Sequence, residues 1–321
     1  MCRQMALVFA IALAGFTTVG ATQAEEWPTR SIRAIVPLSA GSAVDVVPRI
    51  VLEQVSKQLK QTIVVENKPG ASGTIGARVV VTAEPDGYTI LAHSSALVIA
   101  ASTVPNLPYD PIKDLKPVAA LGNLPNVLVV SPSTNIKTIK DLVALGKQRP
   151  ITFGSIGVGN PIQLSMQRLR MSAGFEARTI VFRGAPEAIV EAMTGRIDAY
   201  YSPVTNALPL IRDHKLVPLV VSSPTRSSVL PDVPTSEEAG YPNSAYRFWI
   251  GIFAPAKTPA AIVDRLSKEI EKALLVPEVQ ERLAKLGVQP MSMDDKQFAE
   301  FVKHELTVNT ELTKAAGIAV Q

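Results

Sequence analysis

The chain is poor in the residues that most metal and redox chemistry needs. Of its 321 residues only Cys2 is a cysteine, and three are histidines. Cys2 lies in the N-terminal segment that we predict below to be cleaved. The mature chain would therefore have no disulfide, no thiolate nucleophile and no cysteine metal site. No His-Glu-x-x-His pattern and no Cys/His cluster is present either. We therefore expect no metal ion and no organic cofactor.

The constellations of acyl-transfer enzymes are also missing. No Gly-x-Ser-x-Gly elbow occurs in the sequence. His93 precedes Ser94 and Ser95, but successive residues of a strand point to opposite faces, so it is poorly placed as their base. Acyl transfer needs a nucleophile with a base beside it. We expect no enzyme, and a hydrolase is the disfavoured alternative.

Aromatic residues make up 5% of the chain, and the basic residues are scattered and form no Lys/Arg run. Both features argue against a nucleic-acid partner. The composition, with 47% hydrophobic and 19% charged residues, is typical of a well-buried globular protein. Its length favours two domains over a single core.

The N-terminus has the pattern of a secretory signal. Arg3 is followed by an apolar run, Met5–Val19, and then by the small residues of Thr22–Ala24 at a cleavage position. The run is shorter than the ~20 residues that span a bilayer, which disfavours the alternative of a membrane anchor. We predict a cleaved signal peptide at 1–24 and a secreted mature chain with 31 basic and 28 acidic residues, a net charge of +3.

Beyond the signal, short apolar runs alternate with helical patterns, which indicates α/β units with a parallel sheet and right-handed crossovers. The pattern starts again after the proline-rich stretch 105–117. If the helical tail returns to the first unit, lobe I comprises 25–123 and 224–321, and lobe II comprises 124–223. We predict strands at 32–38, 62–65, 88–92, 127–130, 151–153, 180–182, 197–200, 216–221 and 248–254, and helices at 44–59, 74–83, 186–194, 259–275, 277–286 and 295–315. Asn160, with Pro161 after it and Gln163 three residues on, predicts a further helix start, and Asp294 with Gln297 predicts a capping pair for the last helix.

Two strand–loop–helix junctions carry the functional argument. They are Val36–Asp45 and Phe153–Leu164, and both are rich in Gly, Ser and Ala. Small residues let backbone N–H groups approach a ligand, and a helix N-terminus adds free donors and partial positive charge. Such junctions bind carboxylates or phosphates. The plain alternative is an ordinary turn of an α/β fold.

Side chains in these junctions have a binding and a structural interpretation. Ser42, Ser155 and Asn160 can donate hydrogen bonds to an anion or cap a helix. Asp45 can contact the solute or an ordered water, or stabilise a helix start. Gln163 can reach the solute or fold back on the cap.

Two residues of the second unit are further candidates. Arg183 can pair with a carboxylate or be a surface charge, and Asp198 can face a ligand or be a solvated acid in a turn.

At these junctions the chain resembles the periplasmic receptors of tripartite tricarboxylate transporters, often called Bug-type receptors. The likeness covers residues 27–318, nearly the whole mature chain. It is carried, in order, by the segments IVPLSAGSAVD, VVENKPGASGTIGA, PDGYTIL, LPYDPIKDLKPV, VLVVSPS, ITFGSIGVGN, TGRIDAYY, LPDVPTSEEAGYP and WIGIFAPAKTP.

The resemblance implies a type II periplasmic binding protein: a two-lobed Venus-flytrap α/β fold with two parallel-core sheets and two connecting strands. It implies a monomer in the periplasm that binds a small carboxylate, an amino acid or an aromatic acid or amide. The partners would be the integral membrane permease subunits of the transporter. The alternative partner for the same fold is the sensor kinase of a two-component system.

The resemblance also assigns residues to the cleft. The loops 37–45 and 155–160 hold a carboxylate through backbone amides, hydroxyls and waters, and other segments line the cleft from each lobe. The predicted ligand-binding residues are Leu38, Ser39, Ala40, Ser42, Asp45, Ser94 and Ser95 in lobe I, with Ser155, Gly157, Gly159, Asn160, Gln163, Arg183, Gly184, Ala185 and Asp198 in lobe II.

The chain departs from the family pattern inside both loops. The first loop usually reads Pro-Phe-Pro-Pro-Gly-Gly, and here Leu38, Ser39, Ala40 and Ser42 replace four of those residues. In the second loop Asn160 replaces a serine and Gln163 replaces a histidine. An amide in place of an ionisable histidine favours a less acidic or differently shaped solute.

Overall fold

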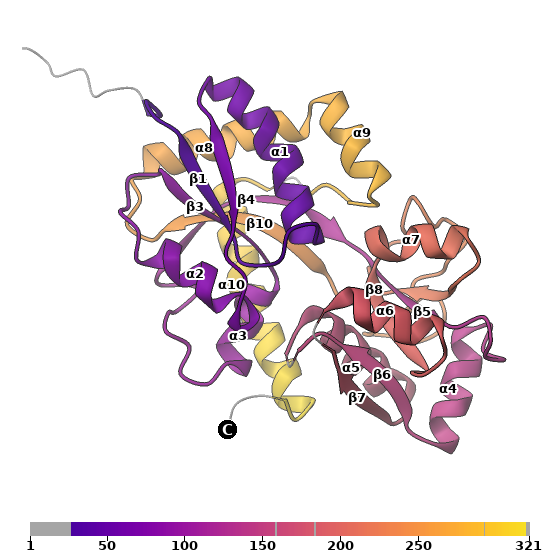
Figure 1. Ribbon diagram of the computed structural model, residues 1–321. Coiled ribbons are helices and arrows are strands. Elements are labelled where there is room, and N and C mark those ends of the chain that lie inside the picture. The colour runs from indigo at the N-terminus through magenta and orange to yellow at the C-terminus, as the bar shows by residue number, and fades with distance from the viewer. Residues whose placement is uncertain (1–26, 158, 183, 292, 319–321) are drawn as a thin grey trace, which may run out of the picture.

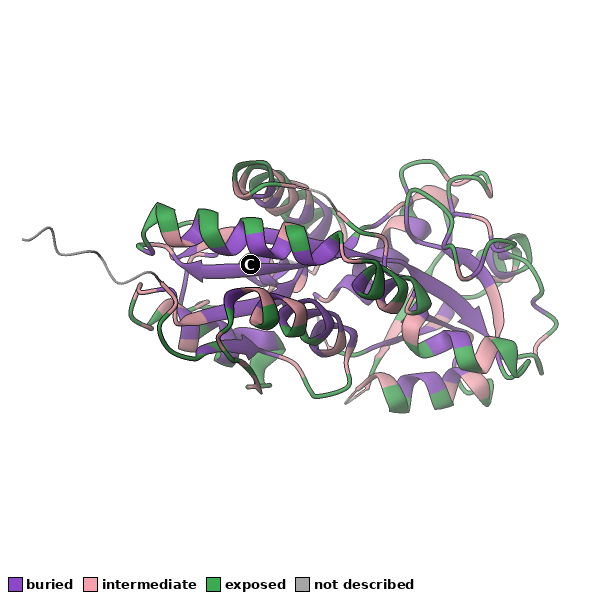
Figure 2. Ribbon diagram, turned by 90° about the horizontal axis from the view of Figure 1, so that it is seen from above, coloured by how far each residue is buried: buried purple, intermediate pink, exposed green. Residues whose placement is uncertain are grey.

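The computed structural model describes residues 27–157, 159–182, 184–291 and 293–318. The predicted signal peptide lies outside the described residues, and so does Arg183. The described chain forms two lobes, each built around a five-stranded sheet (Figure 1). Strands lie in the interior, and the outward faces of the helices are exposed (Figure 2). No helix among the described residues is long and apolar enough to cross a membrane.

The lobe I sheet has the strand order β2-β1-β3-β10-β4. Its first three strands are parallel, and β10 runs antiparallel to both β3 and β4. The predicted parallel core is therefore present and is extended by an antiparallel pair. The strands are β1 (Ile32–Val36), β2 (Ile63–Asn67), β3 (Thr89–Ser94), β4 (Leu115–Leu124) and β10 (Phe248–Pro255).

Helices cover both faces of this sheet because alternate residues of each strand point to opposite sides. Ile32 and Ala34 pack toward α1, α8 and α9, whereas Ile35 packs toward α2, α3 and α10. The helices are α1 (Ala43–Leu59), α2 (Thr74–Val81), α3 (Ala96–Thr103), α8 (Ala260–Leu274), α9 (Pro277–Lys285) and α10 (Asp295–Ala315), with a short 3-10 turn at Ala71–Gly73.

Lobe II repeats this plan with the strand order β7-β6-β8-β5-β9. Strands β7, β6 and β8 are parallel, and β5 is antiparallel to β8 and β9. The elements are β5 (Asn126–Val130), α4 (Ile139–Gln148), β6 (Ile151–Ser155), α5 (Pro161–Ala173), β7 (Ala177–Val181), α6 (Ala185–Met193), β8 (Ala199–Pro203), α7 (Val204–Arg212) and β9 (Val217–Val221).

The chain crosses between the lobes twice. The first crossing is abrupt, because β4 ends at Leu124 and β5 begins at Asn126. The return follows β9, but Leu230 and Val233 still pack in the lobe II core, and Thr235 bridges to β9. The return crossing therefore lies later than the predicted boundary at residue 224. Beyond it, β10 and the last three helices rejoin lobe I.

Local signals predicted the helix starts well. Asp294 and Gln297 form the predicted capping box of α10, and Asn160 caps α5 with Pro161 in its first turn. The predicted strands and helices recur with small shifts at their ends. The elements α3, β4, α4 and α7 were not predicted. Helix α3 has no amphipathic pattern, but α4 and α7 are amphipathic, so their periodicity was available in the sequence.

Candidate functional site

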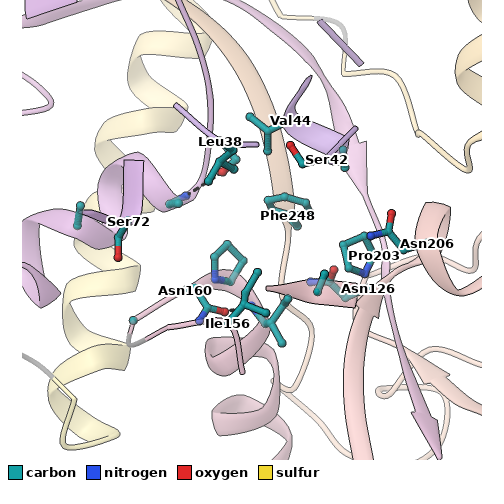
Figure 3. Close-up of a pocket in the computed structure, with 18 of the residues that line it drawn as sticks. Leu38, Ser42, Val44, Ser72, Asn126, Ile156, Asn160, Pro203, Asn206 and Phe248 are labelled. Carbon is teal, nitrogen blue, oxygen red and sulfur yellow. Dashed lines mark hydrogen bonds between the residues drawn. The ribbon is translucent and has the colours of Figure 1, made fainter. Parts of the chain in front are cut away.

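A cavity of about 150 Å³ lies between the two lobes. Lobe I contributes Leu38, Ser42 and Val44, which face Ile156 and Asn160 of lobe II across it (Figure 3). Its walls are mostly apolar, and no charged side chain among the described residues lines it. Of the predicted ligand-binding residues, it brings together Leu38, Ser42, Ser94, Gly159, Asn160 and Ala185.

The start of α1 supplies hydrogen-bond donors to this cavity. Ser42 is the N-cap residue, but its side chain makes no capping hydrogen bond, and its Oγ is buried without a partner. Ala43 and Val44, the first residues of the helix, line the cavity. Backbone N–H groups of a first helical turn have no partner within the helix. Together with the helix dipole, they favour an anionic group at this position.

Asp45 secures the loop from inside and does not line the cavity. Its carboxylate accepts hydrogen bonds from Gly41 N (2.9 Å), Arg49 Nε (2.8 Å) and Asn67 Nδ2 (2.9 Å). Burial raises the pKa of this carboxyl, but the Gly41 N–H, the Asn67 amide and Arg49 outweigh it and hold the pKa below its usual value. Asn67 Nδ2 also donates to Leu38 O, so one network holds both ends of the loop.

Ser39 and Ala40 are exposed at the tip of the same loop. They do not line the cavity, and Ser39 O accepts a hydrogen bond from Ser42 N in a turn that leads into α1. In the structure, Ser39 and Ala40 form part of this turn.

The lobe II loop is held by hydrogen bonds between its own residues and the start of α5. Asn160 Oδ1 accepts from Ile162 N and Gln163 N at 2.9 and 3.1 Å, so it occupies the first donors of α5. Asn160 Nδ2 donates to Ser155 Oγ and to Gly157 O, both at 2.8 Å. Asn160 and Ile162 line the cavity, whereas Ser155, Gly157 and Gln163 do not, so the Asn160 side chain serves the loop as well as the site.

Gln163 folds back on the cap, which was the structural interpretation of this residue. Its Oε1 accepts a hydrogen bond from Gly159 N at 2.7 Å, and the side chain is buried outside the cavity lining. The amide therefore fixes the position of Gly159, which does line the cavity.

Ser94 and Ser95 follow β3 at the lobe I wall. Ser94 lines the cavity, and its Oγ accepts from Ala96 N at 3.3 Å. Ser95 Oγ is buried without a partner behind the wall. His93 lies on the other face of the strand, where burial lowers the pKa of its imidazole to about 3. Among the described residues it receives a hydrogen bond only from the backbone N–H of Ser94, so it forms no side-chain pair of base and nucleophile with them.

Asp198 lies away from the cavity. It precedes β8, whereas Pro203, at the other end of that strand, lines the cavity. Its carboxylate pairs with Arg149 at 2.6 Å and accepts from Thr152 N and Oγ1. Burial raises the pKa of the Asp198 carboxyl, but Arg149 and Thr152 outweigh that and lower it.

On the same lobe, Gly184 is the N-cap of α6, and Ala185 begins the helix at the cavity wall.

Several cavity residues escaped sequence analysis. Asn126 follows the first crossing and Phe248 begins the return strand, so both lie where the lobes meet. Thr103 ends α3, which had not been predicted. Ser72, Ile156 and Asn206 also line the cavity. The available signal was general, since ligands bind at the carboxyl ends of strands in open α/β sheets.

No group of His, Cys, Asp and Glu side chains in the described ranges could hold a metal ion. Chemically, the site offers backbone and hydroxyl donors, amide groups and apolar contacts. It is suited to enclosing a small solute with one acceptor group held at α1.

Comparisons with known proteins agree with this geometry. The family described as "Tripartite tricarboxylate transporter family receptor" matches residues 47–318. The UPF0065 protein in the tcbD-tcbE intergenic region of Pseudomonas sp. (strain P51) is 35% identical over 299 residues, which are 92% of this chain and 89% of that protein.

Solved structures show the same fold. The periplasmic binding protein BugD superposes with a TM-score of 0.83 at 31% identity, covering 92% of this chain and all of BugD. The R. palustris protein Rpa4515, solved with adipate, superposes with a TM-score of 0.85 at 27% identity, covering 91% of this chain and 99% of that one.

Proposed function

Because the chain belongs to the tripartite tricarboxylate transporter receptor family, we propose that it captures a small carboxylate between its lobes and delivers it to the membrane permease subunits of such a transporter. The receptors of this family are solute-binding proteins of the periplasm and not enzymes. The predicted signal peptide at 1–24 would direct this chain to the same compartment.

The observation that carries the proposal is the free N-terminus of α1 at the cavity. Ser42 leaves its hydroxyl uncommitted, and the N–H groups of Ala43 and Val44 make no hydrogen bond to another described residue. A carboxylate placed there accepts several hydrogen bonds and meets the positive end of the helix dipole. The absence of a lysine or arginine among the described lining residues is compatible with this mode, because the backbone supplies the donors.

The cavity dimensions support a small solute. About 150 Å³ accommodates a molecule of a few carbon atoms, and the apolar side chains of Leu38, Val44, Ile156 and Phe248 would contact its body. The related Rpa4515 was solved with adipate, a molecule of this size class. Both lobes contribute to the wall, so binding should favour the closed form over the open one.

Thermal unfolding of the exported, mature protein tests the proposal against a panel of organic acids, amino acids and their amides. A ligand that binds only the folded state adds about 2.7 kcal/mol of stability at a hundred times its dissociation constant. We expect at least one carboxylate to raise the melting temperature and to be recovered unchanged. A folded protein that responds to no acid, or that converts the acid to a product, would contradict the proposal.

A further inference from the structure

Asn126 occupies the end of the cavity nearest the first crossing. It is the first residue of β5, its side chain is fully buried, and it lines the cavity beside Pro203 (Figure 3). The two residues are also paired across the β5–β8 ladder. This polar side chain is therefore part of the site and lies at the junction of the two lobes.

The orientation of the Asn126 amide is set by Ser165. Asn126 Nδ2 donates to Ser165 Oγ at 3.4 Å. The Ser165 hydroxyl donates its own hydrogen to Pro161 O at 2.9 Å, so toward Asn126 it can only accept. If the amide turned over, Asn126 Oδ1 would face the lone pairs of Ser165 Oγ. The carbonyl oxygen is consequently the atom that stays available.

Asn126 Oδ1 has no hydrogen-bond partner among the described residues and is shielded from solvent. The backbone opposite Asn126 in the β5–β8 ladder supplies no donor. Pro203 has no N–H, and the next amide, Val204 N, donates to Pro125 O at 3.0 Å. A buried acceptor without a donor is unfavourable, and a ligand that brings the missing donor removes that penalty.

We propose that the solute carries an uncharged hydrogen-bond donor, an amide N–H or a hydroxyl, which it presents to Asn126 Oδ1. The inference rests on the proposed function, in which α1 holds the carboxylate at the opposite, lobe I wall. The solute class is then a hydroxy acid or the half-amide of a dicarboxylic acid. A second carboxylate at this place would set two acceptors against each other.

Titration calorimetry with matched acids tests this inference. For chains of four, five and six carbons, the probes are the plain alkyl acid, the ω-hydroxy acid, the dicarboxylate and its half-amide. We expect the hydroxy acid or the half-amide to bind at least tenfold more tightly than the alkyl acid and the dicarboxylate of the same length.

Two variants locate the effect. Asn126→Ala should bind the donor-bearing acid no more tightly than the alkyl acid. Ser165→Ala frees the Asn126 amide to turn over, so the preference for half-amide over dicarboxylate should fall at least fivefold. Ser172→Ala is the matched control: it removes another α5 serine that donates to a proline carbonyl, Pro242 O, away from the cavity, and should leave the preference unchanged.

The outcomes separate the two proposals. If the alkyl acid or the dicarboxylate binds as tightly as the donor-bearing acid, the donor inference is overturned and the carboxylate receptor stands. An unchanged preference in both Asn126→Ala and Ser165→Ala, with both variants folded, also overturns it. If none of the acids binds to the folded protein, the proposed function fails and this inference fails with it.

Discussion

Gly159 of lobe II and Thr103 of lobe I meet across the cleft. A Cβ atom added to Gly159 would overlap the side chain of Thr103 at the end of α3. The backbone of Gly159 has a φ of +65°, which also favours glycine. The lobes therefore close to this separation only because the lobe II loop has no side chain at this position.

Substitution of Gly159 should accordingly weaken binding. Gly159→Ala would hold the lobes apart, and we expect the affinity for the solute, measured by calorimetry, to fall at least tenfold. Gly174→Ala is a matched control, because Gly174 has the same φ but nothing within 4 Å of an added Cβ. It should share the backbone strain of about 1 kcal/mol and keep its affinity. Equal losses of affinity in the two variants would refute the steric argument.

The loop network around Asp45 should matter for both stability and binding. Asp45→Asn removes a carboxylate that accepts from Gly41 N and Arg49 Nε, and we expect a loss of about 1–3 kcal/mol in the free energy of unfolding and weaker binding. Asp198→Asn removes a carboxylate with a comparable set of partners far from the cavity, so it should cost stability alone. If Asp198→Asn weakened binding as much as Asp45→Asn, the loop would not be the cause.

The lowered pKa of Asp45 gives this contribution a pH dependence. The unfolded carboxyl titrates near 3.8, and the folded one titrates lower. Asp45 therefore adds stability that is fully present above that pH and is lost as the pH falls through the folded pKa. Wild type and Asp45→Asn should converge in unfolding free energy at strongly acidic pH and differ most near neutrality.

His93 should make the protein sensitive to mild acid. Burial lowers its pKa from 6.5 to about 3, so the unfolded chain takes up this proton first. The stability contribution is present above pH 6.5 and is lost as the pH falls toward 3, by up to about 1.4 kcal/mol per pH unit. Denaturant unfolding at several pH values should show a shallower slope in His93→Gln than in wild type. Parallel slopes would mean that the imidazole is accessible to protons in the folded state.

Gln163 acts through Gly159 and should not set specificity. Gln163→Ala leaves Gly159 N without its acceptor, and we expect all bound acids to lose affinity by a similar factor, about fivefold for about 1 kcal/mol. Gln167→Ala is the control, since its buried amide accepts from Arg170 Nε outside the cavity. A changed ranking of the acids in Gln163→Ala would show instead that this side chain contacts the solute.

Much of the fold could be predicted because its signals are local. The cap at Asn160 with Pro161, and the capping pair of Asp294 with Gln297, fix helix starts within a few residues of chain. The apolar runs of the parallel strands are similarly short-range, and the family resemblance extended them to a two-lobed receptor. Of the elements that were not predicted, β4 depends on burial supplied by distant segments, whereas α7 is amphipathic and could have been predicted from its periodicity.

The candidate site also has features that the sequence predicts and features that only the folded structure determines. The sequence alone determined that two small-residue loops precede two helices, and it predicted that both loops offer donors to a carboxylate. Only the tertiary structure decided that Asn160 and Gln163 consume the donors of the second loop, that Asp198 lies at the far end of β8, and that Asn126 and Phe248 complete the cavity. The hydrogen bonds of Asn160 and Gln163 are local, but the sequence left capping and binding open as alternatives for these side chains. The other placements depend on contacts between residues far apart in the chain, and local periodicity carries no information about which of them form.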